Sequence, residues 1–243
     1  MTQTPPPTVG LVDTSGFHNA QLEASTLRIM EGASWKRQNT VILLPAANKV
    51  LTKCAMAWMH LMTPPNQRAP KIAMLGMEVG DAYTQAIDFI LRTPGLNDCE
   101  FVLTIEHDNL PPPDGLLKLL AQMDKHPEFA CIGGLYWTKG HGGVPQIWGD
   151  PKDPVPNFRP QPPDPSGGLV ECCGTGMGFN LWRTDTFRDV RLPKPLFKTK
   201  ASMAEGVGTQ DLAAWSELRN LGYRCAIDCS VLVGHVAEDG FVW

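Results

Sequence analysis

The chain has little of what membrane-spanning and nucleic-acid-binding proteins need. Its longest apolar stretches, TVILLPAA and SVLVGHVA, are long enough for a β-strand and too short to cross a bilayer. The first residues, MTQTPPPTVG, have neither the basic start nor the apolar core of a signal peptide. The formal net charge is −4 and there is no basic stripe, which argues against general nucleic-acid binding. We therefore expect a cytoplasmic protein with no transmembrane segment.

The chain also lacks a disulfide framework and a zinc motif. Its seven cysteines are an odd number and are scattered along the sequence. The closest groupings, CC at 172–173 and CAIDC at 225–229, lack the two-residue gap that is common in structural zinc sites. This spacing is typical of reduced, buried thiols in a cytoplasmic protein.

Short apolar stretches alternate with segments of helical periodicity along the chain. The alternation predicts an α/β fold in which a mostly parallel central sheet carries helices on both faces. We expect Asp81 to cap the second helix. The expected strands are 40–46, 71–77, 101–105, 129–137, 169–173, a strand from Phe179, and 224–235. The expected helices are 49–62, 81–93, 114–126 and 209–222.

Two segments fall outside this alternation. Residues 1–38 contain a proline run, so we treat them as an N-terminal arm or edge element and assign residues 39–243 to the main domain. Residues 138–168 are rich in Pro and Gly and have no periodicity. A loop of this length inside a domain is usually functional or disordered.

Glu106, His107 and Asp108 follow the third apolar strand, and three prolines come after Leu110. Ligands of open α/β sheets gather at the carboxyl ends of the strands. Alternation along an extended chain would turn Glu106 and Asp108 to the same side, with His107 opposite. Two carboxylates at this rim suit Mg²⁺ or Mn²⁺. Taken alone, however, acidic residues in such a place also fit simple turn capping.

The stretch FVLTIEHDNLPPPDGLLKLL resembles the Asp-x-Asp region of nucleotide-sugar glycosyltransferases with the A-type fold, particularly the family 2 group. CCGTGMGFNLWRTDTF is similar to that family's glycine-rich turn and strand, and TQDLAAWSELRNLGYR to its acidic-pair helix. VGHV resembles its late histidine, and VILLPAANKV its first strand and Pro-x-x-Asn turn. These segments come in the family's order between about residues 40 and 236. The resemblance implies a single-domain, Rossmann-like nucleotide-diphospho-sugar transferase fold.

The chain departs from the family pattern in three places. Glu106 stands where Asp is usual, and Gln210 stands where the acidic pair usually begins with Glu. GMEVGD replaces the common Asp-Asp turn, so Glu78 or Asp81 would take over contact with the nucleoside.

The resemblance implies a role for each matching residue. Asp108, helped by Glu106 and His235, would hold Mn²⁺ or Mg²⁺ against the diphosphate of the donor. Asp211 would be the general base that deprotonates the acceptor hydroxyl. Simpler readings are a strand-end histidine for His235 and a helix N-terminal acid for Asp211. The residues expected to contact the donor are Pro45, Asn48, Glu78, Asp81, Glu106, Trp148, Gly174 and Gly176.

Further residues are candidates for binding sugar or closing the site. Trp137, Trp148 and Trp182 have rings that can stack on a sugar face, and the irregular loop around Trp148 favours that residue. Trp58 and Trp215 lie on expected helices and fit a core. We expect residues 198–208 to form a lid and residues 138–168 to govern acceptor choice.

The resulting hypothesis is an inverting, metal-dependent glycosyltransferase of the hexosyltransferase class, with a UDP-sugar favoured as donor. A retaining enzyme on the same fold and a catalytically silent carbohydrate- or nucleotide-sugar-binding protein are the alternatives. A nucleotidyltransferase would need a Gly-rich basic loop that PAANKVLTK does not supply, and a two-metal hydrolase would need a second carboxylate cluster. The sequence leaves open the oligomeric state and the acceptor, which is a glycan, a protein, a lipid or a modified nucleic acid.

Overall fold

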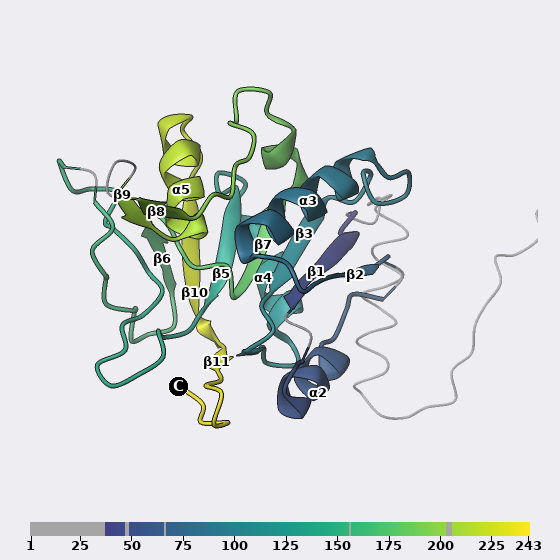
Figure 1. Cartoon of the computed structure of the whole chain (residues 1–243), viewed down its shortest axis with the longest axis horizontal. Helices are drawn as coiled ribbons and strands as arrows, with labels where there is room; N and C mark the ends of the chain where they lie inside the picture. Colours follow the sequence, from purple (N-terminus) through teal and green to yellow (C-terminus); the bar gives the residue numbers. More distant parts are fainter. Residues whose placement is uncertain (1–36, 47–48, 66, 156, 203–205) are drawn as a thin grey trace, which may run out of the picture. The chain divides into compact units, whose positions relative to one another are not determined.

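A seven-stranded mixed sheet lies at the centre of the part of the chain that the structure describes (Figure 1). The computed structural model describes residues 37–46, 49–65, 67–155, 157–202 and 206–243. The strand order across the sheet is β2-β1-β3-β7-β5-β10-β6. The strands are β1 (Thr40–Ala46), β2 (Lys71–Leu75), β3 (Phe101–Ile105), β5 (Cys131–Leu135), β6 (Leu169–Cys172), β7 (Phe179–Arg183) and β10 (Cys225–Leu232).

The sheet is mostly parallel, as the sequence predicts. β1 pairs in parallel with both β2 and β3, and β5 pairs in parallel with β10. Two strands run the other way: β7 is antiparallel to β3 and β5, and β6 is antiparallel to β10. These two follow the long loop and the glycine turn, where the regular alternation of strand and helix is interrupted.

Helices cover both faces of the sheet, as the sequence also predicts. Alternate residues of β1 point to opposite faces: Val41 and Leu43 belong to one apolar core, and Ile42 and Leu44 belong to another. Tyr83 on α3 and Trp215 on α5 pack in the first core, whereas α4 packs in the second. The helices are α2 (Thr52–His60), α3 (Val79–Arg92), α4 (Gly115–Lys125) and α5 (Gln210–Asn220), with a 3₁₀ helix η1 at Thr184–Arg188.

Two small two-stranded sheets lie outside the central one. β4 (Asn109–Leu110) pairs with β11 (Gly234–His235), and β8 (Lys200–Ser202) pairs with β9 (Gly206–Gly208). The β8–β9 pair falls within the expected lid at 198–208, of which residues 203–205 are outside the described residues. The β4–β11 pair joins the Glu106–Asp108 region to the end of the chain.

The start of α3 differs from the prediction. The helix begins at Val79, and its N-cap is Glu78 instead of Asp81. Glu78 Oε2 accepts the backbone N–H of Asp81 at 3.0 Å, which satisfies one of the free donors of the first turn.

The predicted N-terminal arm, residues 1–38, falls almost entirely outside the described residues. All seven cysteines are buried and unbridged, which agrees with the predicted thiols. Of the helices in the described ranges, none has the length and apolar character that a membrane crossing requires. The cytoplasmic location stays a prediction.

Candidate active site

A pocket opens at the carboxyl ends of β1 and β3. The chain places β2 on one side of β1 and β3 on the other, so the order of the strands reverses between β1 and β3. Open α/β sheets bind their ligands at such a reversal. The pocket has a volume of about 290 Å³. Its lining residues are Pro45, Ala46, Met77, Val79, Ala82, Glu106, His107, Asp108 and Gln210.

The Glu106–Asp108 segment lies in the pocket wall but is not extended. The backbone N–H of Asn109 donates to the carbonyl oxygen of Glu106 at 3.1 Å, which closes a turn directly after β3. The strand alternation from which we predicted that His107 points away from the two carboxylates does not apply here, because a turn does not follow the alternation of a strand. All three residues line the pocket.

Glu106 is held against the buried hydroxyl of Tyr83. The Tyr83 hydroxyl donates to Glu106 Oε1 at 3.1 Å. Burial, together with the negative charges of Asp108 and Asp211, raises the pKa of Glu106 to about 8. Glu106 therefore carries its proton at neutral pH, and Asp211 lies near enough to influence it.

We expect Glu106→Gln to flatten the pH dependence of stability between pH 5 and 8. The folded-state pKa lies above the unfolded value, so in this window the folded chain holds one more proton than the unfolded chain. The free energy of unfolding then falls as pH rises, by up to about 1.4 kcal/mol per pH unit. Urea unfolding at pH 5, 6, 7 and 8 measures the slope. Glu238→Gln changes an exposed carboxylate and should leave the slope at its wild-type value. A slope in Glu106→Gln equal to that of the wild-type protein would contradict the raised pKa of Glu106.

Asp108 and His235 meet although they are far apart in the sequence. Pairing of β4 with β11 sets His235 opposite Asn109, and the backbone N–H of Val236 donates to the carbonyl oxygen of Asp108 at 2.7 Å. His235 Nε2 lies 3.5 Å from Asp108 Oδ2. The ammonium group of Lys139 also binds Asp108 Oδ2. Burial would raise the pKa of Asp108, but His235 and Lys139 hold it well below its usual range.

The second ring nitrogen of His235 is fixed by the main chain. Nδ1 lies 2.7 Å from the carbonyl oxygen of Trp137, which can only accept, so Nδ1 carries the hydrogen. Nε2 therefore faces Asp108: it donates to the carboxylate when it carries a hydrogen, and it offers a lone pair to a cation when it does not. The Tyr136 ring packs edge-on against the imidazole, at 5.4 Å between centroids. Asp108 and His235 thus form a preoriented pair of ligands for a cation.

The predicted metal ligands fit a divalent ion only in part. Asp108 and His235 lie together, but Glu106 is protonated and hydrogen-bonded to Tyr83. The ammonium group of Lys139 already binds the carboxylate of Asp108. In the described ranges no group of three or more His, Cys, Asp and Glu side chains is placed to hold a metal ion. The cation that Asp108 holds in this arrangement is the ammonium of Lys139.

Asp211, the predicted base, lies in the first turn of α5. Its Oδ1 accepts the backbone N–H of Leu212 at 2.8 Å. Burial raises the pKa of Asp211, although hydrogen bonds from Thr209 and Leu212 oppose the shift. Its neighbour Gln210 lines the pocket. A carboxylate with a raised pKa beside the pocket has the properties of a general base.

The glycines of the turn at 174–178 are buried and packed against protein atoms. A Cβ on Gly174 would lie 3.0 Å from Trp215, and one on Gly176 would lie 2.4 Å from the hydroxyl of Tyr136. The hydroxyl of Tyr136 also accepts the backbone N–H of Gly178 at 2.8 Å. The structure thus shows close packing at these glycines, against Trp215 for Gly174 and against Tyr136 for Gly176 and Gly178, and their contact with the donor stays a prediction.

The tryptophans divide differently from the prediction. Trp182, a candidate for sugar stacking, is fully buried and stacks on Trp215, so that prediction is wrong: an inward position on β7 belongs to the core. Trp148 is half-buried, and its Nε1 donates to Gln146 Oε1 at 2.8 Å. Trp137 is half-buried against the core and binds His235 through its carbonyl. Trp58 is half-buried on α2 against the second core.

The remaining donor-site predictions have mixed outcomes. Pro45 lines the pocket, whereas Asn48 lies outside the described residues. Glu78 caps α3 and accepts the Thr199 hydroxyl at 2.8 Å, so it joins α3 to the start of the expected lid. Asp81 is exposed and does not line the pocket.

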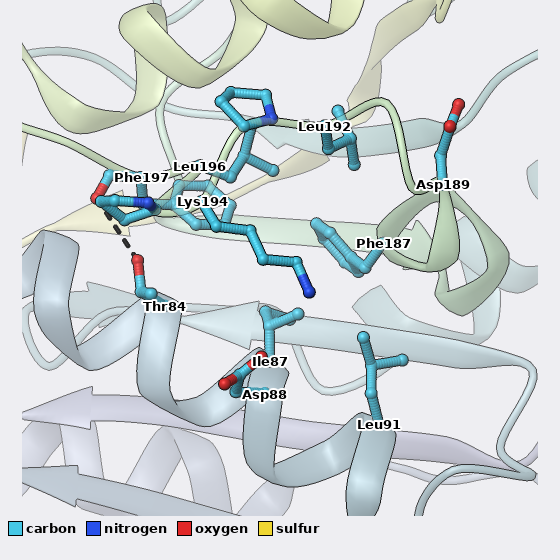
Figure 2. A pocket seen from close by; sticks show the side chains of 12 residues that line it. Thr84, Ile87, Asp88, Leu91, Phe187, Asp189, Leu192, Lys194, Leu196 and Phe197 are labelled. Atoms are coloured by element: carbon cyan, nitrogen blue, oxygen red, sulfur yellow. Dashed lines mark hydrogen bonds between the residues drawn. The ribbon is translucent and has the colours of Figure 1, made fainter.

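A second, apolar cavity is lined by residues of α3 and of the segment from Phe187 to Phe197 (Figure 2). It has a volume of about 190 Å³ and separates α3 from the segment that ends at Phe197. Figure 2 shows Ile87 and Leu91 on one wall and Phe187, Leu192 and Leu196 on the other. The Phe197 ring packs on Tyr83 at 5.2 Å between centroids. Phe197 thus links this cavity to Tyr83, and the walls are mostly apolar.

Sequence reasoning missed Tyr83, Tyr136 and Lys139. The two tyrosines look like core aromatics in the sequence, and both are buried. The Tyr83 hydroxyl donates to Glu106, and the Tyr136 hydroxyl accepts the backbone N–H of Gly178. Lys139 follows the apolar stretch ending at Trp137, and no local signal marks it. Its position becomes visible only through its contact with Asp108.

The fold and the position of the pocket define an α/β protein of Rossmann-like architecture, with a mostly parallel sheet and a pocket at the reversal of strand order. Among solved structures, the chain is similar to A197 from STIV, with a TM-score of 0.58 and 13% sequence identity over 84% of this chain and 88% of that chain. At this identity the likeness shows the fold alone. No protein-family model matches the chain, and neither does any curated protein.

Proposed function

We propose that the protein transfers a sugar from a nucleotide-sugar donor, with a UDP-sugar favoured, to an acceptor hydroxyl. The observation that carries the proposal is the pocket between the ends of β1 and β3, with Asp108 and Glu106 in its wall and Asp211 beside it. Three of the segments that resemble a glycosyltransferase contribute residues to the pocket wall, namely Pro45, Glu106 to Asp108, and Gln210. The acceptor is undefined, and its choice is assigned to the loop at 138–168.

The reaction is a single displacement at the anomeric carbon. The acceptor oxygen forms a bond to this carbon, and the bond from the carbon to the diphosphate oxygen breaks. The electron pair leaves with the nucleoside diphosphate, and the proton of the acceptor hydroxyl passes to Asp211. One base opposite the leaving group gives inversion. Because the described side chains fit a divalent ion only in part, no step is assigned to one.

A catalytically silent binding protein is the second candidate. Gln210 replaces the acid that usually opens the pair, and it lines the pocket, so one of two expected carboxylates is missing there. The carboxylate of Asp211 is retained next to Gln210, and a carboxylate is the group that the enzyme needs as its base.

We expect one class of nucleoside diphosphate to bind this pocket, and Val79→Trp to abolish the binding. Val79 lies at the first position of α3 and lines the pocket, so an indole there occupies the space of the ligand. Calorimetry with UDP, GDP, dTDP and CDP and their sugars, with and without Mn²⁺, measures the affinities. Val190→Trp is the matched control, because Val190 is 93% exposed and away from the pocket. Binding that survives in Val79→Trp would place the ligand elsewhere, and no binding at all would overturn the proposed function.

A further inference from the structure

Lys139 lies on a short, well-closed turn at the start of the long loop. The backbone N–H of Thr138 donates to the carbonyl oxygen of Val144 at 2.9 Å, and the N–H of Val144 donates to the Thr138 hydroxyl at 2.9 Å. Gly140 and Gly142 adopt φ values of 100° and 79°, which favour glycine. The turn therefore has a defined conformation that carries Lys139 to one place.

The turn is fixed to the same group of residues that holds Asp108. The carbonyl of Trp137, two residues before Lys139, accepts from His235. The His141 ring packs edge-on against Trp243 at 5.9 Å, and Trp243 pairs through its backbone with His235. Lys139, His235 and Asp108 thus belong to one connected structure. The Lys139 side chain remains 35% exposed to solvent.

The ammonium of Lys139 takes the place expected for a metal ion. It contacts Asp108 Oδ2, the same oxygen that lies 3.5 Å from His235 Nε2. An ammonium group has three N–H donors, and the bond to Asp108 uses one of them. The others are suited to anionic oxygens, because lysine binds phosphate as a compact point charge.

We propose that Lys139 supplies the positive charge for the diphosphate of the donor, so that the protein binds this group without a divalent ion. The inference rests on the proposed function, because a departing diphosphate is the group that needs the charge. Asp108 and His235 hold the ammonium where the predicted metal would lie. Lys139 also competes with a metal ion for Asp108 Oδ2, because two cations at one carboxylate oxygen repel each other.

The test uses the full chain, with inorganic pyrophosphate and Mn²⁺ as probes. Pyrophosphate should bind the wild-type protein in EDTA. Lys139→Met should weaken that binding by about 10- to 100-fold, as expected for loss of a hydrogen bond to a charged group. Lys139→Arg keeps the charge and should bind. Lys152→Met is the matched control, because Lys152 is exposed and lies in the same loop. Thermal unfolding of each variant shows that it is folded.

A second readout separates charge from structure. Mn²⁺ alone, followed by electron paramagnetic resonance, should not bind the wild-type protein and should bind Lys139→Met, where Asp108 and His235 are released. Mn²⁺ should then restore pyrophosphate binding to that variant, and adding His235→Ala should remove the Mn²⁺ site. A merely structural role of Lys139 would not create a metal site.

The inference is overturned if the wild-type protein needs Mn²⁺ to bind pyrophosphate, does not bind it at all, or binds it no better than Lys139→Met. These outcomes differ from failure of the proposed function. A protein that binds pyrophosphate through Lys139 but binds no nucleotide sugar would keep Lys139 as a residue that binds a diphosphate without a metal ion, and would overturn the sugar transfer. If the Lys139→Met protein binds a nucleotide sugar as well as the wild-type protein does, the proposed sugar transfer would stand and this inference would be overturned.

Discussion

Asp211→Asn is expected to lower the rate of sugar transfer by about 10²- to 10⁴-fold and to leave donor binding unchanged. The substitution keeps the shape of the side chain and removes its ability to take a proton. Asn retains an oxygen that can accept the backbone N–H of Leu212, as Asp211 does at 2.8 Å. Because burial raises the pKa of Asp211, the loss of its charge does not destabilise the folded state. Release of nucleoside diphosphate measures the rate, and calorimetry measures the binding.

The matched control for this result is Glu217→Gln, which changes a carboxyl on the same helix. An Asp211→Asn protein with a normal rate would remove Asp211 from the chemistry. Analysis of the product anomer adds a second check, because inversion requires one displacement with one base. A retained anomer would instead favour the retaining enzyme, in which Asp211 only orients groups.

We expect Trp215→Ala to lower the free energy of unfolding by about 3–5 kcal/mol. Trp215 on α5 stacks on Trp182 of β7, with 4.7 Å between ring centroids and 18° between planes, and both side chains are fully buried. Removing the indole leaves a cavity between the helix and the sheet. Trp215 is four residues from Asp211 on α5, so the substitution should also loosen the predicted base. Urea unfolding measures the loss.

Trp215→Phe separates packing from hydrogen bonding. The described residues offer the indole N–H of Trp215 no hydrogen-bond partner. Replacement by Phe therefore loses no hydrogen bond and keeps an aromatic ring on Trp182, and we expect a cost below about 1.5 kcal/mol. Equal losses in the Ala and Phe variants would contradict the view that ring stacking fixes α5 to the sheet.

The fold follows from local patterns in the sequence to a large extent. Apolar runs of strand length predict β1, β3 and β5 because a strand buried on both faces contains few polar residues. Helical periodicity predicts α3 and α4 for a similar reason. The cap at Glu78 and the turn after β3 were missed, because each depends on a single hydrogen bond that periodicity does not encode.

The site is less predictable because its contacts join distant parts of the chain. The family resemblance brought Asp108 and His235 together as cation ligands, and the structure places them 3.5 Å apart. It does not indicate that Lys139 binds Asp108 or that Tyr83 binds Glu106, since both contacts arise from packing between separate elements. Nor does it indicate that Tyr136 packs against Gly176 and Gly178, since Tyr136 belongs to a distant part of the chain.

The central claim is that a nucleotide sugar binds between the ends of β1 and β3. Amide NMR spectra of the labelled protein, titrated with UDP, GDP, dTDP and CDP in turn, test it most directly. We expect one nucleotide to shift the amide signals of Ala46, Val79 and Asp108 in the pocket wall. The signals of Ile87 and Leu192 in the second cavity should remain in place. Shifts confined to the second cavity, or no shifts with any nucleotide, would contradict the claim.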